Sequence, residues 1–219
     1  MREWICRAVF LLALSVLACT SAWAQPSPIT STVPNCVMLV GTNGFVPDPA
    51  GQVTVVVRDA NSNVMPNVGV IFDLINVPDI EICPNQPAGQ TATCAPGVRR
   101  VCRVTDAFGV ANFIVYGKSV GPAIAQSALG EIWANSTASC VLGGGSVQLT
   151  TVSVSAIDLD GVGGVGANDL SVWLADFSTG DPWTRSDYDC TGNVGANDFS
   201  IWLTLFGLGG SGVTCAVGC

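Results

Sequence analysis

The order of hydrophobic and polar positions divides the chain into a long β-rich part and a short helical part. Between residues 34 and 155, short runs of valine, isoleucine, leucine and phenylalanine are separated by clusters of Asp, Asn, Pro and Gly, which is typical of strands joined by turns. The clearest of these runs are 53–58, 68–74, 110–116 and 147–154. Several short strands within about 120 residues predict a β-sandwich.

Two later segments have the hydrophobic period of an α-helix. In each, apolar side chains lie at positions i, i+3, i+4 and i+7, which places them in one stripe along a helix. The stripe residues are Leu170, Trp173, Leu174 and Phe177 in the first segment, and Phe199, Trp202, Leu203 and Phe206 in the second. We interpret both stripes as the core of a small two-helix unit. Residues 147–155 alternate as a strand does, so no helix is expected to lead into this unit.

Each predicted helix follows a 12-residue loop, and the two loops repeat each other with an offset of 29 residues. Asp occupies positions 1, 3 and 12 of both loops, and Gly163 and Gly192 occupy position 6, where a sharp turn needs a residue that tolerates positive φ. The Asp residues are Asp158, Asp160 and Asp169 in loop one, and Asp187, Asp189 and Asp198 in loop two. This spacing is the pattern of an EF-hand-type calcium loop.

Calcium prefers six to eight oxygen ligands, so the expected ligand set extends beyond the carboxylates. We expect the backbone carbonyls of Gly164 and Asn193 at position 7 to contribute, together with the Thr191 hydroxyl at position 5 of loop two. Val162 at position 5 of loop one has no ligating atom, so loop two is predicted to be the better site. The alternative is a pair of acidic, glycine-rich turns that bind nothing. Two copies in register, each followed by a matching helix, favour Ca²⁺ as the cofactor.

Paired loop–helix units without entering helices resemble dockerin type I modules, the calcium-dependent plugs of bacterial polysaccharide-degrading assemblies. The resemblance covers residues 157–207. It implies that loop positions 10 and 11 contact a cohesin-like domain or another surface protein, or that the module stabilises the C-terminal part of the chain. These positions are Ala167, Asn168, Ala196 and Asn197.

The β-rich part has its own resemblance, carried by two turn-rich segments. Residues 58–68 and 104–113 are similar to the turn and hairpin of bacterial Ig-like group 1 domains, which are found in invasin- and intimin-type adhesins. The insertion at 76–97 departs from that family. The resemblance implies a stalk or spacer in cell adhesion. The expected fold class is therefore mainly β, with an Ig-like β-sandwich at 34–155 followed by a small two-helix, two-loop calcium-binding module at 156–207.

The first residues have the pattern of an export signal. Arg2 and Arg7 precede the apolar run 8–18, and Ala22-Trp-Ala24 matches a signal peptidase site, so we expect a signal peptide at 1–24, a linker at 25–33, and a secreted or surface-displayed protein. The apolar run is too short to span a bilayer, and no other segment approaches the needed length, so no transmembrane span is expected. In the alternative, residues 16–19 act as a bacterial lipoprotein box, and Cys19 carries a lipid anchor.

Export would place the cysteines in an oxidising compartment. Removing residues 1–24 leaves eight of the ten cysteines, an even number that indicates disulfides but permits 105 connectivities. Cys83 with Cys94 would close a loop rich in Pro and Gly and is the expected pair; residues 208–219 form a Gly/Cys tail. The chain has no histidine and no CxxC motif, which argues against zinc.

Composition and motifs narrow the function. The net charge is −8, and eight of the sixteen acidic residues lie between Asp158 and Asp198, so nucleic-acid binding is not expected. Without histidine, Ser-His-Asp and Cys-His catalysis are excluded, and no nucleotide-binding motif is present. We therefore expect a non-enzymatic calcium-binding protein. The alternative is a carbohydrate-binding or adhesive surface protein, an accessory to polysaccharide degradation, in which Trp133 contacts glycan and calcium is structural.

Overall fold

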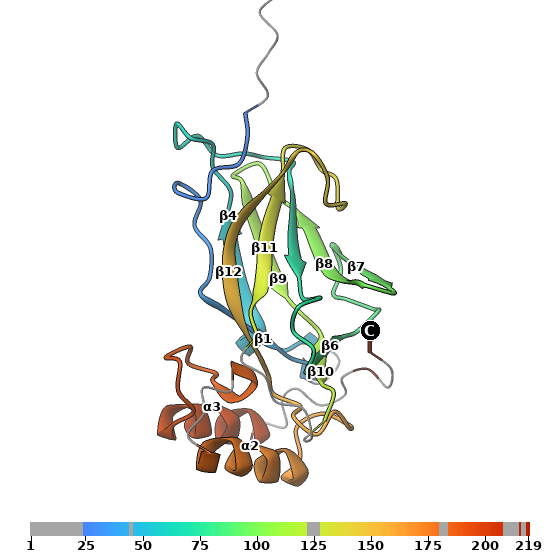
Figure 1. Ribbon diagram of the computed structural model, residues 1–219, viewed down its shortest axis with the longest axis vertical. Helices are drawn as coiled ribbons and strands as arrows, with labels where there is room; N and C mark the ends of the chain where they lie inside the picture. Colours follow the sequence, from blue (N-terminus) through green and yellow to red (C-terminus); the bar gives the residue numbers. More distant parts are fainter. Residues whose placement is uncertain (1–23, 44–45, 122–127, 180–183, 208–214, 216–217) are drawn as a thin grey trace, which may run out of the picture.

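The computed structural model describes residues 24–43, 46–121, 128–179, 184–207, 215 and 218–219. The described chain is mainly β, as expected, and its two longer helices lie side by side beyond one end of the strands (Figure 1). The segments predicted as strands at 53–58, 68–74, 110–116 and 147–154 are confirmed, with their ends shifted by a few residues.

The largest sheet has six strands and a single parallel pair. Its order is β1 (Cys36–Leu39), β12 (Ser146–Ala156), β11 (Gly130–Asn135), β5 (Gly69–Asp73), β8 (Val98–Val104) and β7 (Gln90–Ala95). The strands β1 and β12 run parallel, and the other neighbours are antiparallel. All five residues of β5 are buried, which explains its continuous apolar sequence.

Three two-stranded sheets accompany the large one. They are β4 (Gln52–Val56) with β9 (Val110–Ile114), β6 (Ile80–Ile82) with β10 (Gly117–Ser119), and β2 (Thr42–Asn43) with β3 (Val46–Pro47); a short 3₁₀ helix, η1 (Pro49–Gly51), precedes β4. The first hydrophobic core joins the β4–β9 pair to the large sheet, and Phe72 of β5 meets Phe113 of β9 edge to face with ring centroids 4.5 Å apart.

The helical part consists of α2 (Ala167–Thr179), the 3₁₀ helix η2 (Thr184–Ser186) and α3 (Ala196–Gly207). The long strand β12 leads directly into the first acidic loop, so no helix enters it, as expected (Figure 1). A second hydrophobic core fills the space between the helices and the end of β1. Its buried members are Met38, Val40, Ile157, Leu159, Val172, Trp173, Tyr188, Trp202 and Leu205. The helices are therefore packed on the strands and not only on each other.

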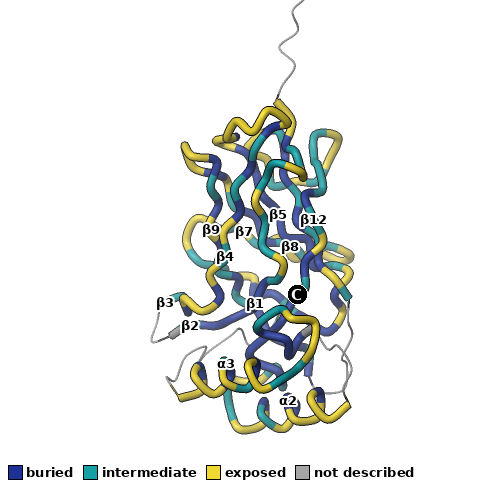
Figure 2. Tube along the Cα trace, turned by 90° about the vertical axis from the view of Figure 1, so that its left-hand side faces the viewer, coloured by how far each residue is buried: buried dark blue, intermediate teal, exposed yellow. Residues whose placement is uncertain are grey.

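The interpretation of the two apolar stripes as core is wrong for half of each stripe. Trp173 and Trp202 are buried, but the exposed fractions of Leu174, Phe177, Leu203 and Phe206 are 50%, 50%, 50% and 44%. The helices turn a different face inward, with Val172 and Leu205 in the second core, because Met38 of β1 and the residues that follow β1 and β12 supply apolar partners on that side. Figure 2 shows the outer sides of both helices as exposed.

Four disulfides lie within the described residues, and the expected Cys83–Cys94 pair is wrong. The pairs are Cys36–Cys190, Cys83–Cys215, Cys94–Cys219 and Cys102–Cys140. Cys83 and Cys94 both pair with the last part of the chain because that part returns to the sheet: the backbones of Ile82 and Cys219 exchange hydrogen bonds of 3.0 and 3.4 Å. Three of the four bridges therefore join the C-terminal part of the chain to the β-rich part: one starts in loop two, at Cys190, and two start after α3, at Cys215 and Cys219.

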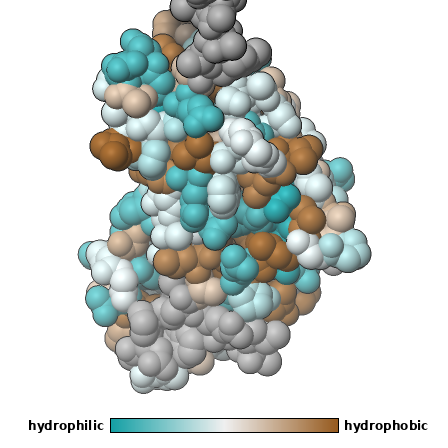
Figure 3. Space-filling view, turned by 45° about the horizontal axis from the view of Figure 1, so that its top comes forward, coloured by the Kyte–Doolittle hydropathy of each residue, from teal (hydrophilic) through white to brown (hydrophobic). Residues whose placement is uncertain are grey.

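The alternative lipid anchor at Cys19 and the expected signal peptide at 1–24, except for its last residue, lie outside the described residues. Among the helices that the structure describes, none is long and apolar enough to cross a membrane. The surface near the end of the molecule opposite the helices shows hydrophilic and hydrophobic residues interspersed, without one broad apolar area in that view (Figure 3).

Candidate metal centre

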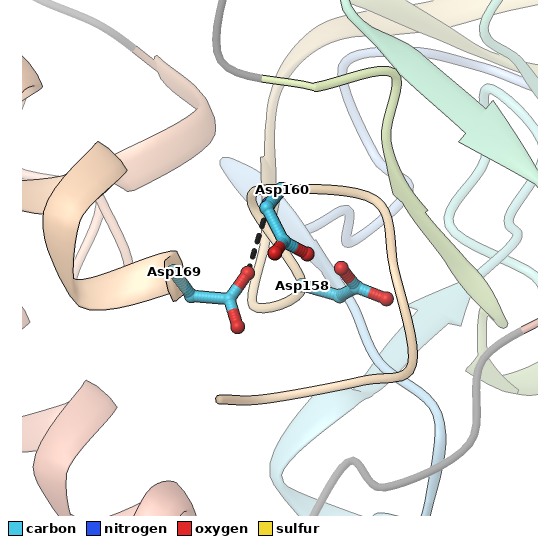
Figure 4. A group of neighbouring side chains, drawn as sticks. All are labelled: Asp158, Asp160 and Asp169. Carbon is cyan, nitrogen blue, oxygen red and sulfur yellow. Dashed lines mark hydrogen bonds between the residues drawn. The ribbon is translucent and has the colours of Figure 1, made fainter. Parts of the chain in front are cut away.

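Loop one brings its three Asp side chains together at the end of β12. One carboxylate oxygen from each of Asp158, Asp160 and Asp169 lies within 4.8 Å of the others, and the three side chains converge from the loop and from the first turn of α2 (Figure 4). Asp158 and Asp169 are buried, while Asp160 is partly exposed. The spacing predicted this convergence, and the structure contains it.

Asp169 also holds the loop in shape through hydrogen bonds from backbone N–H groups. Its Oδ1 accepts from Leu159 at 2.6 Å and Asp160 at 2.8 Å, and its Oδ2 accepts from Gly166 at 2.5 Å. The backbone N–H of Gly164 donates to Asp158 Oδ2 at 3.1 Å. Asp169 thus orders the loop through both of its carboxylate oxygens, and Asp158 does so through Oδ2.

Loop two repeats this arrangement at the start of α3. Carboxylate oxygens of Asp187, Asp189 and Asp198 also lie within 4.8 Å of one another. Asp198 Oδ1 accepts from the N–H groups of Tyr188 at 2.7 Å and Asp189 at 3.0 Å, and its Oδ2 accepts from Gly195 at 2.7 Å. The same three hydrogen bonds thus connect position 12 to positions 2, 3 and 9 in both loops. The two loops are folded alike.

Burial of the position-2 residues explains why each loop lies against its helix. Leu159 and Tyr188 both enter the second hydrophobic core, next to the tryptophans of α2 and α3. A ladder of aromatic rings then connects the helices: Phe177 contacts Trp173 at 5.2 Å, Trp173 contacts Phe199 at 5.1 Å, and Trp202 contacts Phe206 at 5.0 Å between centroids. The metal-loop carboxylates are therefore positioned by apolar packing as well as by hydrogen bonds.

The loops differ at position 5, as the sequence predicted. The Thr191 hydroxyl donates to Asp189 Oδ1 at 2.7 Å, so it lies beside the carboxylates of loop two. Its Oγ1 is 3.4 Å from the backbone carbonyl oxygen of Asn193, which brings that expected ligand to the same side of the loop. In loop one the Val162 side chain is exposed and only its backbone N–H, at 2.8 Å from Asp160 Oδ1, takes part.

The carboxylates have shifted pKa values, and the causes are those of a crowded acidic site. Burial, followed by the charges of Asp160 and Asp158, raises the pKa of Asp169 to about 6, although backbone N–H donors oppose the shift. Burial also raises the pKa of Asp187, with Asp198 adding to it. The pKa of Asp189 is lowered, mainly because the Thr191 hydroxyl donates a hydrogen bond to it. A cation between the carboxylates would offset the desolvation and the charge repulsion that raise the pKa values of Asp169 and Asp187.

The donor set fits a hard divalent cation. Each group offers three carboxylates, and the nearby additional atoms are hydroxyl and carbonyl oxygens; the described cysteines are all in disulfides. Hard ions such as Ca²⁺ take oxygen ligands of this kind, whereas zinc and copper prefer nitrogen and sulfur. The residues that could hold such an ion are Asp158, Asp160 and Asp169 in loop one and Asp187, Asp189 and Asp198 in loop two.

The residues expected to contact a partner are all on the surface. Ala167 and Asn168 begin α2, Ala196 and Asn197 begin α3, and all four are exposed. Trp133, named for glycan contact, lies within the six-stranded sheet on β11 and is only partly exposed. Its indole N–H donates to Glu131 Oε2 at 2.9 Å, so the polar edge of the ring is already used within the strand.

Two features near the loops were not predicted from the sequence. Asp176 of α2 accepts hydrogen bonds from buried Arg185, and Cys190 of loop two forms a disulfide with Cys36 of β1. The first feature has a weak sequence signal, since Arg185 is the single basic residue in an acidic stretch. The second also has one: Cys190 stands at position 4, where loop one has Gly161. Neither signal identifies the partner residue.

Comparison of the chain with protein-family models, with curated proteins and with solved structures finds no match.

Proposed function

We propose that this protein is an exported, non-enzymatic calcium-binding protein. In the proposal, an Ig-like β domain carries a dockerin-like pair of calcium loops. The observation that carries the proposal is the duplicated group of three Asp carboxylates, each group within 4.8 Å, at the end of β12 and before α3. Two groups with the same hydrogen-bond pattern, each at the start of a helix, are unlike scattered surface acids. The four disulfides support export to an oxidising compartment.

The choice of calcium over magnesium rests on the number and arrangement of donors. Calcium accepts six to eight oxygens in flexible geometry, while magnesium requires a near-ideal octahedron and keeps several waters. A loop that contributes three carboxylates plus main-chain and hydroxyl oxygens suits the larger ion. Thr191 gives loop two one more oxygen than loop one, so loop two is the stronger proposed site.

The proposed role of the outer surface of α2 and α3 is to bind a protein partner. Four large apolar side chains remain half exposed on the outer faces of α2 and α3, namely Leu174, Phe177, Leu203 and Phe206. They lie on the same two helices as the exposed residues at loop positions 10 and 11. Calcium in both loops would hold these helices in fixed positions, so that the exposed side chains form one surface for a cohesin-like or other surface protein.

The test is an isothermal calorimetric titration of the intact, disulfide-bonded protein with Ca²⁺, in which Mg²⁺ is the competing ion. A second readout is terbium luminescence excited through Trp173 and Trp202, which lie near the loops. We expect binding of Ca²⁺ in preference to Mg²⁺, and loss of the loop-two signal in Asp187→Asn and Asp198→Asn. The matched control is Asp106→Asn, an exposed carboxylate in a turn of the β-rich part. No heat and no luminescence at millimolar ion would reject the proposal.

A further inference from the structure

Position 4 of the two acidic loops has the same unusual backbone conformation with two different residues. Gly161 in loop one has φ = 76°, and Cys190 in loop two has φ = 62°. Glycine adopts this left-handed conformation without strain, whereas a residue with a side chain does so at a cost of roughly 1 kcal/mol or more. Only two other non-glycine residues among those described, Ser62 and Asn67, have positive φ. The structure must therefore hold Cys190 in place.

The disulfide to Cys36 is the covalent connection that holds it. Cys36 is the first residue of β1 and lies opposite Ser153 in the parallel pair with β12. Strand β12 ends at Ala156 and continues directly into Asp158, the first carboxylate of loop one. The two acidic loops are thus attached to neighbouring strands that pair with each other: loop one to β12 through the peptide chain, and loop two to β1 through the disulfide.

Cys190 lies between the residues that would hold the ion in loop two. Asp189 precedes it, and Thr191 follows it; the Thr191 N–H donates to Asp187 Oδ1 at 3.1 Å and to Asp189 Oδ1 at 3.2 Å. These bonds require the chain to reverse at position 4. The Gly192 N–H also donates to Asp187, at 2.7 Å from Oδ2. If Cys190 relaxed to negative φ, the N–H groups of Thr191 and Gly192 would turn away from Asp187, and the carboxylate group would open.

We propose that the Cys36–Cys190 disulfide controls the calcium affinity of loop two, so that the site is strong when the disulfide is intact and weak when a dithiol has reduced it. The inference rests on the proposed calcium function. In the reduction, a thiolate of the dithiol attacks one sulfur and forms a mixed disulfide. Its second thiolate then displaces the protein sulfur. The dithiol is oxidised to its own disulfide. It supplies two electrons and two protons in total, so Cys36 and Cys190 both end as thiols.

The bridge is accessible to such a reagent, and its loss would leave the module attached. Cys36 and Cys190 are both partly exposed, and in the Cys94–Cys219 bridge Cys94 is exposed and Cys219 partly exposed; Cys83 and Cys102 of the other two bridges are buried. The Cys83–Cys215 bridge would still join the end of the chain to the β-rich part. Reduction of Cys36–Cys190 alone therefore loosens loop two without releasing α2 and α3 from the second core.

The coupling is reciprocal. If the intact disulfide favours calcium binding, bound calcium must favour the intact disulfide by the same factor. Coupling energies of this kind correspond to affinity changes of about 5- to 150-fold. Calcium should therefore shift the thiol–disulfide equilibrium of Cys36–Cys190 toward the disulfide. It should leave the Cys102–Cys140 bridge unaffected, because that bridge lies between β8 and residue 140, away from both loops.

The first experiment measures calcium affinity by calorimetry in a background of Asp158→Asn with Asp169→Asn, so that only loop two binds. We expect Cys36→Ser with Cys190→Ser to weaken binding about tenfold or more. Cys36→Ser with Cys190→Gly, which restores the residue type of loop one, should recover part of the loss. The control, Cys94→Ser with Cys219→Ser, removes a bridge that also joins the C-terminal part of the chain to the β-rich part but does not involve loop two. Its calcium affinity should equal that of the Asp158→Asn, Asp169→Asn background.

The second experiment uses the unmodified protein and does not depend on whether the variants fold. The protein is equilibrated in buffers of set reduced-to-oxidised dithiothreitol ratio, with and without Ca²⁺, and alkylated cysteines are counted by peptide mass mapping. We expect calcium to lower the equilibrium labelling of Cys36 and Cys190 at a given ratio and to leave the labelling of Cys102 unchanged. Equal affinities in the first experiment, or equal equilibrium labelling in protein that binds calcium, would overturn the inference. Absence of calcium binding in the unmodified protein would instead reject the proposed function.

Discussion

Arg185 and Asp176 form a buried, two-point ion pair between η2 and α2. Arg185 Nε and Nη2 donate to the two carboxylate oxygens of Asp176 at 2.9 and 2.7 Å, and both side chains are less than 5% exposed. Ser186 Oγ adds a hydrogen bond to Asp176 at 2.6 Å, and Arg185 Nη1 donates to the Gly121 carbonyl at 3.1 Å. The pair thus connects α2, the residues immediately before loop two and the segment after β10.

Replacing Arg185 by Met should strongly destabilise the protein. The Asp176 carboxylate would remain buried without its cationic partner, and breaking a buried pair in this way costs about 3–5 kcal/mol. Urea unfolding followed by tryptophan fluorescence measures the change. The double variant Arg185→Met with Asp176→Leu should recover part of the loss, because no unpaired charge remains buried. A single variant within 1 kcal/mol of the original protein would contradict this account of the pair.

Loop two should dominate calcium binding. Thr191 supplies a hydroxyl beside Asp189, while Val162 supplies none. Removing a charge-assisted contact costs about 1.5–3 kcal/mol, which is about tenfold or more in affinity. Asp187→Asn and Asp198→Asn should therefore weaken the tighter calorimetric transition, and Asp158→Asn and Asp169→Asn should affect the weaker one. Equal losses from the two loops would show that position 5 does not rank the sites.

The stability of the calcium-free protein should fall as the pH rises from about 4 to about 6. Burial raises the pKa of Asp169 from 3.8 to about 6, so in this range the folded state binds a proton that the unfolded state has released. Stability then decreases with increasing pH, since the unfolded state carries fewer protons. The measurement is urea unfolding in chelator across this range. Asp169→Asn should lack this component; a parallel pH profile in the variant would assign the slope to other groups.

Removal of calcium should loosen the helical part and leave the β-rich part folded. Emptied of cations, the carboxylates at positions 1, 3 and 12 repel one another, and a unit of this size depends on metals or disulfides for much of its stability. Chelator should change the fluorescence of Trp173 and Trp202, which lie in the second core, and should allow protease cleavage between residues 178 and 186.

The control for this experiment is peptide mapping of the strands, which should stay uncut with and without chelator. If residues 178–186 resist protease equally in both conditions, the ions do not hold the module. The Cys36–Cys190 bridge and the second core would then be the structural reason, since the bridge joins loop two to β1 and the core contains residues of both helices and of β1.

The sequence by itself determined the elements whose signals are local. The runs that became β4, β5, β9 and β12 alternate or are continuously apolar, and the loop spacing brought three Asp together twice. Both results depend on residues within one element or one turn. The edge strand β7 and its neighbour β8 were harder to predict: β7 contains Thr and Ala, and β8 contains three Arg. Many of these residues are exposed or only partly buried, so the hydrophobic period is weak there.

Only the tertiary structure decided which surfaces and which cysteines meet. The helix period correctly gave two stripes, but Met38 of β1 and the adjacent Val40 are packing partners of the helices, and half of each stripe faces outward. The disulfides likewise join residues 38 to 154 positions apart, so loop closure between near neighbours was a poor guide. Pairings of that kind depend on where β1 and the returning end of the chain lie in space, and no local pattern in the sequence encodes that distance.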